Sequence, residues 1–427
     1  MPRHAPVPLA DVDLSDIDGF AGLRGFAQFD TLRAEDPVHW NDEKDGTGFW
    51  AVTRHADIWA VDRDVETYTS EKFVGLEDVD DDLRDFRRSM LETDGARHRV
   101  LRRLIQREFT PRTLMTHYEG FLRVLTKQTV DRAFASAAAH DGRIDFVEEI
   151  SADFPIQVLA RLLDVPPEDT PQLIAWGNEM VANTDPDYAS VRADTAESER
   201  YRHLPFRSPT VQDVWDYGNR LRGERAGGDG GDLISVLANK MPGDGVPLSP
   251  QDFNNYFSLL VIAGNETTRH AISNSMLGLM EQPGQLALLR QRPELLNTAV
   301  EELLRWSSPV YHFRRTATRD VELGGRTIRE DDKVVMWFAS GNFDPEVFDD
   351  PYTLDVTRTN VDHLTFGKGS PHLCMGANLA RMEIRLMFEE LLPRLESIEL
   401  AGAVRRIRSN FVNGIKAFPV RVAPAPR

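Results

Sequence analysis

The chain has 427 residues, of which 41% are hydrophobic, and this is enough to bury one large core or two to three ordinary ones. Its net charge of −18 argues against nucleic acid as a partner, and its single cysteine excludes a disulfide framework and fits a reducing cytoplasm. The longest apolar run, from Tyr256 to Gly264, is too short to span a bilayer, and the N-terminus lacks the apolar core of a signal peptide.

The first half of the chain predicts an arm, a few strands and then helices. Between 72 and 90, the apolar patch Phe73 to Leu76 precedes an acidic run, 77–85, of the kind that is usually just solvated. The other predicted elements are an irregular arm over 1–20, a hairpin over 38–40 and 49–53, and helices over 26–34, 55–63, 96–108, 114–139, 153–163 and 171–181.

The helix predicted over 96–108 carries two sets of cationic side chains. His98 and Arg102 stand four residues apart and therefore share one face. A stripe of three arginines with the same spacing consists of Arg99, Arg103 and Arg107. On a strongly acidic protein this stripe suits docking of an acidic partner, and the alternative is that the arginines simply lie along the surface.

A poorly patterned connection at 183–209 separates two groups of helices. It lacks apolar periodicity and is therefore expected to be mobile. Its cations can hold a carboxylate, sulfate or phosphate on an otherwise apolar substrate, and the alternative is a surface-exposed basic patch. These side chains, called the lid cations below, are Arg192, Arg200, Arg202, His203 and Arg207.

The longest helical pattern covers 252–280, and apolar positions surround it so widely that it is expected to be central. Its middle reads Ala263-Gly-Asn-Glu-Thr-Thr268. Gly264 removes a side chain where a small ligand can sit, and a locally widened turn would leave room for it. Glu266 and Thr267 can pass protons from solvent to such a ligand. The alternative is a solvated polar stripe with the threonine hydrogen-bonded to its own helix.

The chain beyond 300 alternates helical and extended patterns. Glu302 and Arg305 stand three residues apart near the end of a helix and can pair. Short strands are predicted over 309–338 and a terminal hairpin over 409–422.

The only cysteine lies in the glycine-rich stretch Phe366-Gly-Lys-Gly-Ser-Pro-His-Leu-Cys374-Met-Gly376, directly before an amphipathic helix over 377–392. Orphan backbone N–H groups and the dipole at this helix N-terminus favour the thiolate form of Cys374. One such sulfur suits an axial ligand of a metal macrocycle and suits a four-ligand metal site poorly. The alternative for a lone cysteine is a small buried hydrophobe.

This stretch resembles the haem-ligand loop of the cytochrome P450 superfamily, and the order of the motifs matches that superfamily over roughly residues 20–422. The chain resembles actinobacterial sterol and terpenoid side-chain hydroxylases, which share a cysteine loop one residue longer than usual. Phe366 accordingly stands eight residues before Cys374, and Ser370 takes the place of a usual glycine. The resemblance implies a single domain over 1–427 that is mainly α with a small β-rich lobe.

The resemblance also implies a cofactor site. The cofactor would be haem b (iron protoporphyrin IX), with Cys374 as the axial iron ligand. The residues expected to hold the haem propionates are His98, Arg102, Arg315 and His372. Others expected against the haem are Phe366, Gly367, Gly376, Ala263 and Gly264. Glu302 and Arg305 would engage Arg358 in a later meander, where Phe343 replaces the usual arginine.

The activity implied by the resemblance is insertion of one atom of dioxygen into a C–H bond of a hydrophobic small molecule, of terpenoid, steroid or alkyl-aromatic size. Thr267 and Glu266 would manage protons. Electrons would come from NAD(P)H through a ferredoxin reductase and a ferredoxin, with no nucleic acid or membrane partner and a monomeric state. The residues expected to contact the substrate are Phe73, Val74, Leu76, Leu259, Ala263, Val310, Tyr311, His312, Phe411 and Val412.

Three alternatives remain open at this point. The first keeps the same chemistry on an apolar substrate whose anionic group is held by the lid cations. The second is a haem-based ligand sensor or electron-transfer protein, which would not need the Glu266–Thr267 pair or a basic ferredoxin face. The third is a peroxide-driven peroxygenase, a type of enzyme that often lacks that pair.

Overall fold

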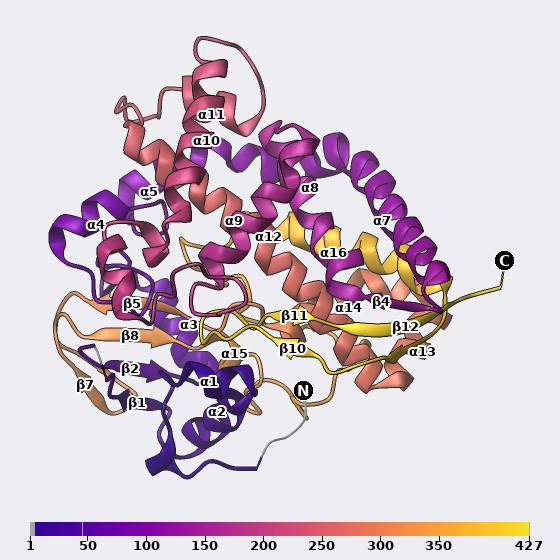
Figure 1. The fold of residues 1–427 in the computed structure, drawn as a ribbon. Helices are drawn as coiled ribbons and strands as arrows, with labels where there is room; N and C mark the ends of the chain where they lie inside the picture. The colour runs from indigo at the N-terminus through magenta and orange to yellow at the C-terminus, as the bar shows by residue number, and fades with distance from the viewer. Residues whose placement is uncertain (1–4, 45, 427) are drawn as a thin grey trace.

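A long helix runs through the middle of the molecule, with other helices packed around it and a group of strands at one end (Figure 1). The computed structural model describes residues 5–44 and 46–426. The long helix is α12 (Pro250–Glu281), and it begins at a capping box in which Ser249 and Asp252 each accept a hydrogen bond from the other's amide. Apolar residues on most of its sides are buried, so α12 is central, as its sequence predicts.

Helices before and after α12 supply most of the remaining structure. Those before it are α1 (Ile17–Ala21), α2 (Arg24–Glu35), α3 (His55–Arg63), α4 (Asp81–Arg87), α5 (Gly95–Ile105), α6 (Pro111–Thr113), α7 (Glu119–Ala139), α8 (Asp153–Leu163), α9 (Thr170–Val181), α10 (Thr210–Arg225) and α11 (Leu233–Asn239). Those after it are α13 (Pro283–Gln291), α14 (Leu296–Ser307), α15 (Phe338–Gly341) and α16 (Ala377–Leu391).

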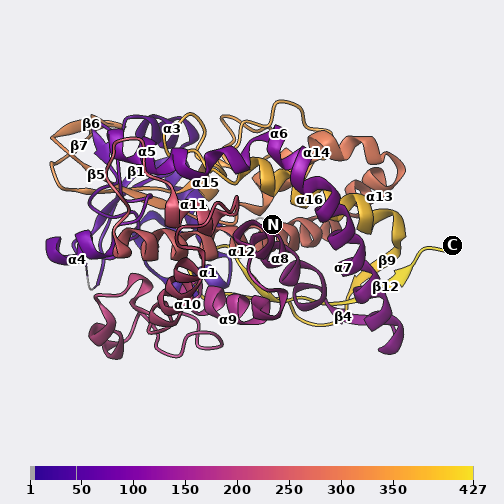
Figure 2. The same ribbon diagram turned by 90° about the horizontal axis from the view of Figure 1, so that it is seen from above.

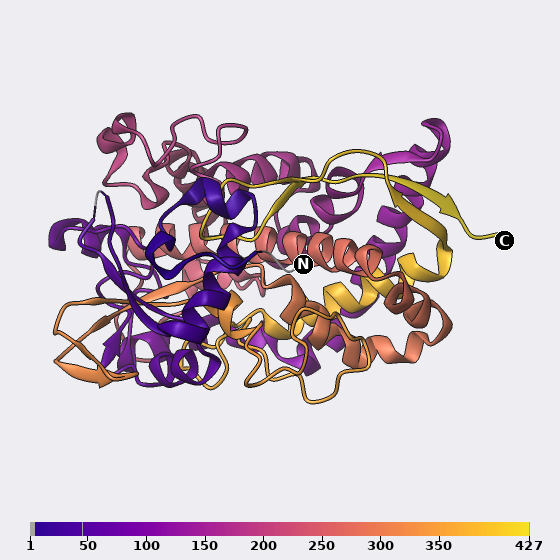
Figure 3. The same cartoon turned by 90° about the horizontal axis from the view of Figure 1, so that it is seen from below.

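Five strands form the main sheet, in the order β1-β2-β8-β5-β3. They are β1 (Val38–Asn41), β2 (Phe49–Val52), β3 (Tyr68–Thr69), β5 (Phe313–Ala317) and β8 (Lys333–Met336). Strands β2 and β8 are parallel, and the other neighbours are antiparallel. Seen from below, the N-terminal helices and these strands occupy the same end of the molecule (Figure 3). This arrangement confirms a mainly α fold with a small β-rich lobe.

The smaller sheets correct one prediction. The segment 409–422 does not form a single hairpin, because its two strands pair with different partners. The sheets are β4-β12-β9, β6-β7 and β10-β11, from β4 (Arg143–Asp145), β6 (Val321–Leu323), β7 (Arg326–Ile328), β9 (Leu395–Leu400), β10 (Arg405–Arg406), β11 (Ile415–Ala417) and β12 (Pro419–Pro424).

Two N-terminal predictions also change. The arm predicted over 1–20 contains a 3₁₀ turn, Leu9–Asp11, and the start of α1, while residues 1–4 lie outside the described part. The acidic run is not simply solvated, because Glu77 bonds to Arg87 and Arg207 at 2.7 and 2.6 Å. Glu77 therefore ties the segment before α4 to the connection at 183–209.

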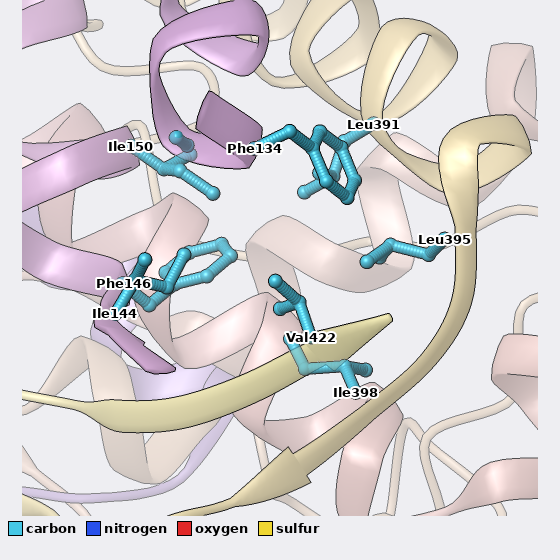
Figure 4. A pocket seen from close by; sticks show the side chains of 9 residues that line it. Phe134, Ile144, Phe146, Ile150, Leu391, Leu395, Ile398 and Val422 are labelled. Carbon is cyan, nitrogen blue, oxygen red and sulfur yellow. The ribbon is translucent and has the colours of Figure 1, made fainter. Parts of the chain in front are cut away.

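A cavity lined only by apolar side chains lies near the end of the molecule that holds β4 and β12 (Figures 1 and 4). Its lining consists of Ala133, Phe134, Ile144, Phe146, Ile150, Leu391, Leu395, Ile398 and Val422. None of these side chains can transfer a proton or bind a metal, so this cavity is not a candidate active site. Among the described residues, no helix has both the length and the apolar character needed to cross a bilayer.

Candidate active site

The cysteine loop is shaped by two glycines and one serine. Gly367 and Gly369 have φ values of 72° and 77°, a region that residues with a Cβ rarely adopt. The backbone then folds back, and the Cys374 amide donates to the Phe366 carbonyl at 2.8 Å. Ser370 has a local purpose, because its hydroxyl accepts a hydrogen bond from the His372 amide at 3.1 Å. The loop thus holds Cys374 immediately before α16.

The Cys374 sulfur is reachable from solvent but crowded by protein atoms. This crowding raises the pKa of the thiol, although the amides of Gly376 and Ala377 and the charge of Arg102 act to lower it. We expected the helix N-terminus alone to favour the thiolate form of Cys374, and this expectation is wrong. Desolvation outweighs the dipole, and a bound cation is what would favour the thiolate here.

One face of α12 is accessible in the middle of an otherwise buried helix. Ala263 is exposed and Thr267, one turn further on, is half-buried, while Thr267 Oγ1 donates to the Ala263 carbonyl at 2.9 Å. Gly264 lies elsewhere on the helix: a Cβ there would come within 3.1 Å of Leu159 on α8. Helix α12 is a continuous α-helix, so the predicted widened turn is absent. The accessible face belongs to Ala263 and Thr267.

Glu266 points away from that face and is only 1% exposed. Its Oε1 accepts a hydrogen bond from Asn265 Nδ2 at 3.0 Å, and its Oε2 lies 3.2 Å from both Arg269 Nη2 and His270 Nε2. Burial alone would raise the pKa of Glu266, but the charge of Arg269, together with the His270 contact, overcomes it and lowers the pKa. Glu266 and Thr267 are adjacent in sequence, but their side chains bond to different groups and not to one another.

The described part of the chain, 5–44 and 46–426, holds no group of three or more His, Cys, Asp or Glu side chains placed to bind a metal ion. A closed metal site of the zinc-finger type needs four such ligands. The arrangement therefore leaves Cys374 as a single-sulfur ligand candidate. Helix α16, which follows it, packs against α12 (Figure 1).

Comparison with known proteins identifies the family of this chain. The cytochrome P450 family model matches residues 288–403. The chain is 36% identical to the steroid C26-monooxygenase of Mycolicibacterium smegmatis, over 97% of this chain and 95% of that protein. It is 37% identical to the linalool 8-monooxygenase of Pseudomonas putida, over 93% of this chain and 95% of that protein.

The chain belongs to the cytochrome P450 family. A solved structure agrees: a Mycobacterium marinum cytochrome P450 in complex with pseudoionone has a TM-score of 0.86 and 34% identity, covering 98% of this chain and 100% of that one. This cytochrome P450 is accordingly a monooxygenase, and its family implies a haem iron cofactor. The resemblance found in the sequence is confirmed.

The residues of this cytochrome P450 fit such a cofactor. Around Cys374 they offer one reachable sulfur, two amides directed at it and the guanidinium of Arg102, whose Nη2 donates to the Leu373 carbonyl at 2.5 Å. The accessible Ala263 and Thr267 offer a small side chain and one hydroxyl, which suits contact with a flat group.

The expected propionate holders are engaged with protein groups. His98 stacks on His372 with ring centroids 4.2 Å apart, and burial lowers the pKa of His98 to about 4. His372 Nε2 lies 2.7 Å from Asp94 Oδ1. Arg315 Nη2 donates to the buried Asp62 at 2.8 Å, and Arg315 Nε has no hydrogen-bond partner. His98, His372 and Arg102 are therefore grouped at the cysteine loop, whereas Arg315 is paired with α3.

Asp94 and Asp62 were not predicted as site residues. Asp94 also accepts hydrogen bonds from Thr69 Oγ1 and the Ser70 amide, at 2.6 and 2.8 Å. Burial would raise the pKa of Asp94, but these bonds and His372 lower it to about 2. Its place just before α5 was the one available signal. The sequence gave no signal for Asp62, because a single acidic residue in an ordinary helix does not form a motif.

Glu302 and Arg305, the pair predicted at the end of α14, are buried, and Arg358 lies beside them. Arg305 Nε and Nη2 both donate to the Glu302 carboxylate at 2.7 Å, and Arg358 Nε lies 3.3 Å from it. Phe343, at the position of the usual arginine, lies with its ring centroid 5.2 Å from the Arg305 guanidinium carbon. This aromatic ring therefore replaces a charged contact by a cation–π contact.

The predicted substrate contacts fall into two groups. Ala263 is exposed, and the half-buried members are Phe73, Leu76, Leu259, Val310 and Phe411. The buried members are Val74, Tyr311, His312 and Val412. Tyr311 bonds to Asn413, and His312 packs against Trp337, so both are corrected to core residues.

Each arginine among the lid cations already has a carboxylate partner. Arg207 pairs with Glu77 at 2.6 Å and with Glu199 at 3.2 Å. Arg192 pairs with Asp194, Arg200 with Glu197, and Arg202 with Asp80 and Glu199. These pairs leave no arginine of the lid unoccupied in the structure, and the predicted mobility of this segment stays a prediction.

Proposed function

We propose that this cytochrome P450 hydroxylates a hydrophobic small molecule of terpenoid or steroid size, using haem b. The observation that carries the reaction class is the cysteine loop, which presents one reachable sulfur beside Arg102. Thiolate ligation makes haem iron able to activate dioxygen and insert one oxygen atom. An enzyme of this class is favoured over a sensor because the relatives are monooxygenases.

The substrate class follows from the exposed apolar groups and from the relatives. The half-buried or exposed contacts, including Phe73, Leu76, Leu259 and Phe411, offer no charge. The relatives act on a steroid and on linalool, and the solved P450 structure holds pseudoionone. A mainly apolar surface of this kind binds by excluding water. A neutral terpenoid or steroid is therefore the proposed substrate.

The residues of the chain have separable tasks in this reaction. Cys374 would hold the haem, and His98, Arg102, His372 and Arg315 would bind its carboxylates through charge-assisted hydrogen bonds. Thr267 Oγ1, now bonded to the Ala263 carbonyl, can turn to hold a proton on the accessible face. Glu266 can exchange that proton with solvent after rotating out of its buried position. The apolar contacts orient the substrate and exclude water.

A spectroscopic titration tests this function. The ferric protein should shift toward the high-spin Soret band when a neutral terpenoid or steroid displaces water from the iron, because the apolar contacts favour an uncharged ligand. Matched neutral and anionic compounds of one carbon skeleton provide the comparison. A response to the anionic members alone would contradict the neutral-substrate proposal. It would also support the lid-cation alternative, which no contact in the structure favours at present.

We further propose a ferredoxin, reduced by an NAD(P)H-dependent ferredoxin reductase, as the electron donor. Arg99 and Arg103 are exposed on α5, and Arg107 is exposed in the 3₁₀ turn Gln106–Phe109 directly after it. None of the three has an ion-pair partner among the described residues. Unpaired cations on a chain of net charge −18 attract an acidic protein. The single cysteine supports a reducing cytoplasm as the setting.

Replacing Arg99, Arg103 and Arg107 by Gln should raise the KM for ferredoxin about tenfold, since three exposed charge contacts of about 0.5 kcal/mol each amount to about a factor of ten. The effect should fade as salt is added. The matched control replaces Arg143, Arg290 and Arg421 by Gln, since these are exposed and also have no ion-pair partner among the described residues. They lie on β4, α13 and β12, at the opposite end from α5 (Figure 2). Equal effects of both triple variants would contradict ferredoxin docking on α5.

A further inference from the structure

The surroundings of Glu266 contain a charge contact that the reaction described above does not explain. Arg269 and His270, on the same helix, are 1% and 0% exposed, and both approach Glu266 Oε2 to 3.2 Å. Neither contact has hydrogen-bond geometry: Glu266 Oε2 and Arg269 Nη2 both lack a hydrogen-bond partner. Asn265 donates a hydrogen bond to the other oxygen, Oε1, so at Oε2 the buried carboxylate is held by charge and not by a directed bond.

Neighbouring elements are shaped around this contact. Arg269 Nη1 donates to Asn178 Oδ1 on α9 at 2.6 Å, so a second helix orients the guanidinium. Two glycines leave space beside these groups. A Cβ at Gly177 would lie 3.0 Å from Asn265 Nδ2, which donates to Glu266, and one at Gly414 would lie 2.8 Å from His270 Nε2. A side chain at Gly414 would therefore displace the His270 ring.

The other titratable groups facing this contact come from two further elements. Tyr188, in the 183–209 connection, feels the charges of Arg269 and Glu266, and burial raises its pKa. Arg406 on β10 acts on His270 and is itself bonded to Asn274 and Asn413. Burial lowers the pKa of His270, so His270 is expected to be neutral and Arg269 carries the charge that holds Glu266.

We propose that Arg269 is a positioning residue for Glu266: it holds the carboxylate turned away from Thr267, so that proton delivery through Glu266 requires this ion pair to open. Arg269 acts only through Glu266 and has this role only if Glu266 moves protons as proposed above. Because Asn178 orients Arg269, a displacement of α9 would loosen the pair. The access of Glu266 to Thr267 is thus coupled to α9.

An infrared titration of the ferric holoenzyme tests the ion pair without turnover. The band of protonated Glu266 is identified by its loss in Glu266→Gln. In Arg269→Gln, this band should persist to a pH about 1 to 3 pH units higher than in the unchanged protein, because a cation in contact stabilises the carboxylate by that amount. An unchanged titration in a folded Arg269→Gln would overturn the proposal. Arg123→Gln, which removes an exposed partner of Glu119, is the matched control and should shift nothing.

A second variant covers the case in which Arg269→Gln does not fold. Asn178→Asp keeps the size of the side chain and all existing charges, but places a second carboxylate on Arg269 Nη1. It competes for the same guanidinium, so protonated Glu266 should again persist to higher pH. If Glu266 in Asn178→Asp titrates as in the unchanged protein when Arg269→Gln is unfolded, the proposal is overturned.

Turnover separates this proposal from the proposed function. The fraction of NAD(P)H consumption that yields product should move along the pH axis by the same amount as the infrared band. If the band shifts but this fraction keeps its pH dependence, Arg269 does hold Glu266, and the proton role of Glu266 is wrong. If the unchanged protein forms no product with any hydrophobic compound, the proposed function fails while the infrared result stands.

Discussion

Cys374→Ser should abolish hydroxylation and remove the thiolate signature from the carbon monoxide difference spectrum of the reduced protein. The rate should fall by more than about 100-fold, because loss of a group outside the ligand shell of a metal site already costs about 10- to 100-fold. The chain has no other cysteine, so no second sulfur can take over the ligand position. Product formation and the spectrum are measured on the same preparation.

Moving the cysteine to another place controls for the presence of a thiol. The double variant Cys374→Ser with Ser397→Cys has the same number of thiols as the unchanged chain, but its thiol lies on exposed β9. It should be as inactive as the single variant. Retention of the thiolate spectrum in either variant would show that Cys374 is not the ligand.

Arg305→Gln should destabilise the folded protein by about 3–5 kcal/mol, which is the cost of removing one partner of a buried ion pair. Arg305 is 0% exposed, and besides its two bonds to Glu302 it donates to the carbonyls of Asn342 and Pro351 at 2.8 and 2.9 Å. Its loss would leave the Glu302 carboxylate with the Arg358 contact and one hydrogen bond from the Asp355 amide, and would also remove the bonds that hold these two carbonyls. Urea unfolding and the fraction of protein that retains haem measure this effect.

The chain offers a matched pair at the surface. Arg200 and Glu197 have the same spacing of three residues and a contact of 2.6 Å, but both side chains are more than half exposed. Arg200→Gln should therefore change the free energy of unfolding by less than about 1 kcal/mol. Similar losses of unfolding free energy in the two variants would mean that the buried Glu302–Arg305 pair stabilises the fold no more than an exposed pair does.

Much of the fold can be read from local patterns. The helix predicted over 55–63 has those bounds in α3, and the one over 153–163 has them in α8, because each combines apolar periodicity with clear ends. The prediction of a terminal hairpin was wrong for a physical reason. A strand pattern records which faces are buried but not which strand will pair with it, and β11 and β12 find different partners.

The candidate site likewise has residues that local patterns predict and partners that they do not predict. Cys374, Glu266–Thr267 and Glu302–Arg305 stand in short motifs, so their types and spacing were evident in the sequence. The partners of these residues come from distant segments. Arg358 lies more than 50 residues after Arg305, and Asp62 lies 253 residues before Arg315, so only folding brings them within bonding distance.

The sequence by itself determined the reaction class, because a lone cysteine in its glycine loop needs only neighbouring residues to be recognised. The tertiary structure decided which groups are free to act. It turned Glu266 away from Thr267, placed Tyr311 and His312 in the core, and gave the lid arginines carboxylate partners. Orientation and pairing depend on what packs against each side chain from elsewhere in the chain, and local patterns carry no record of those neighbours.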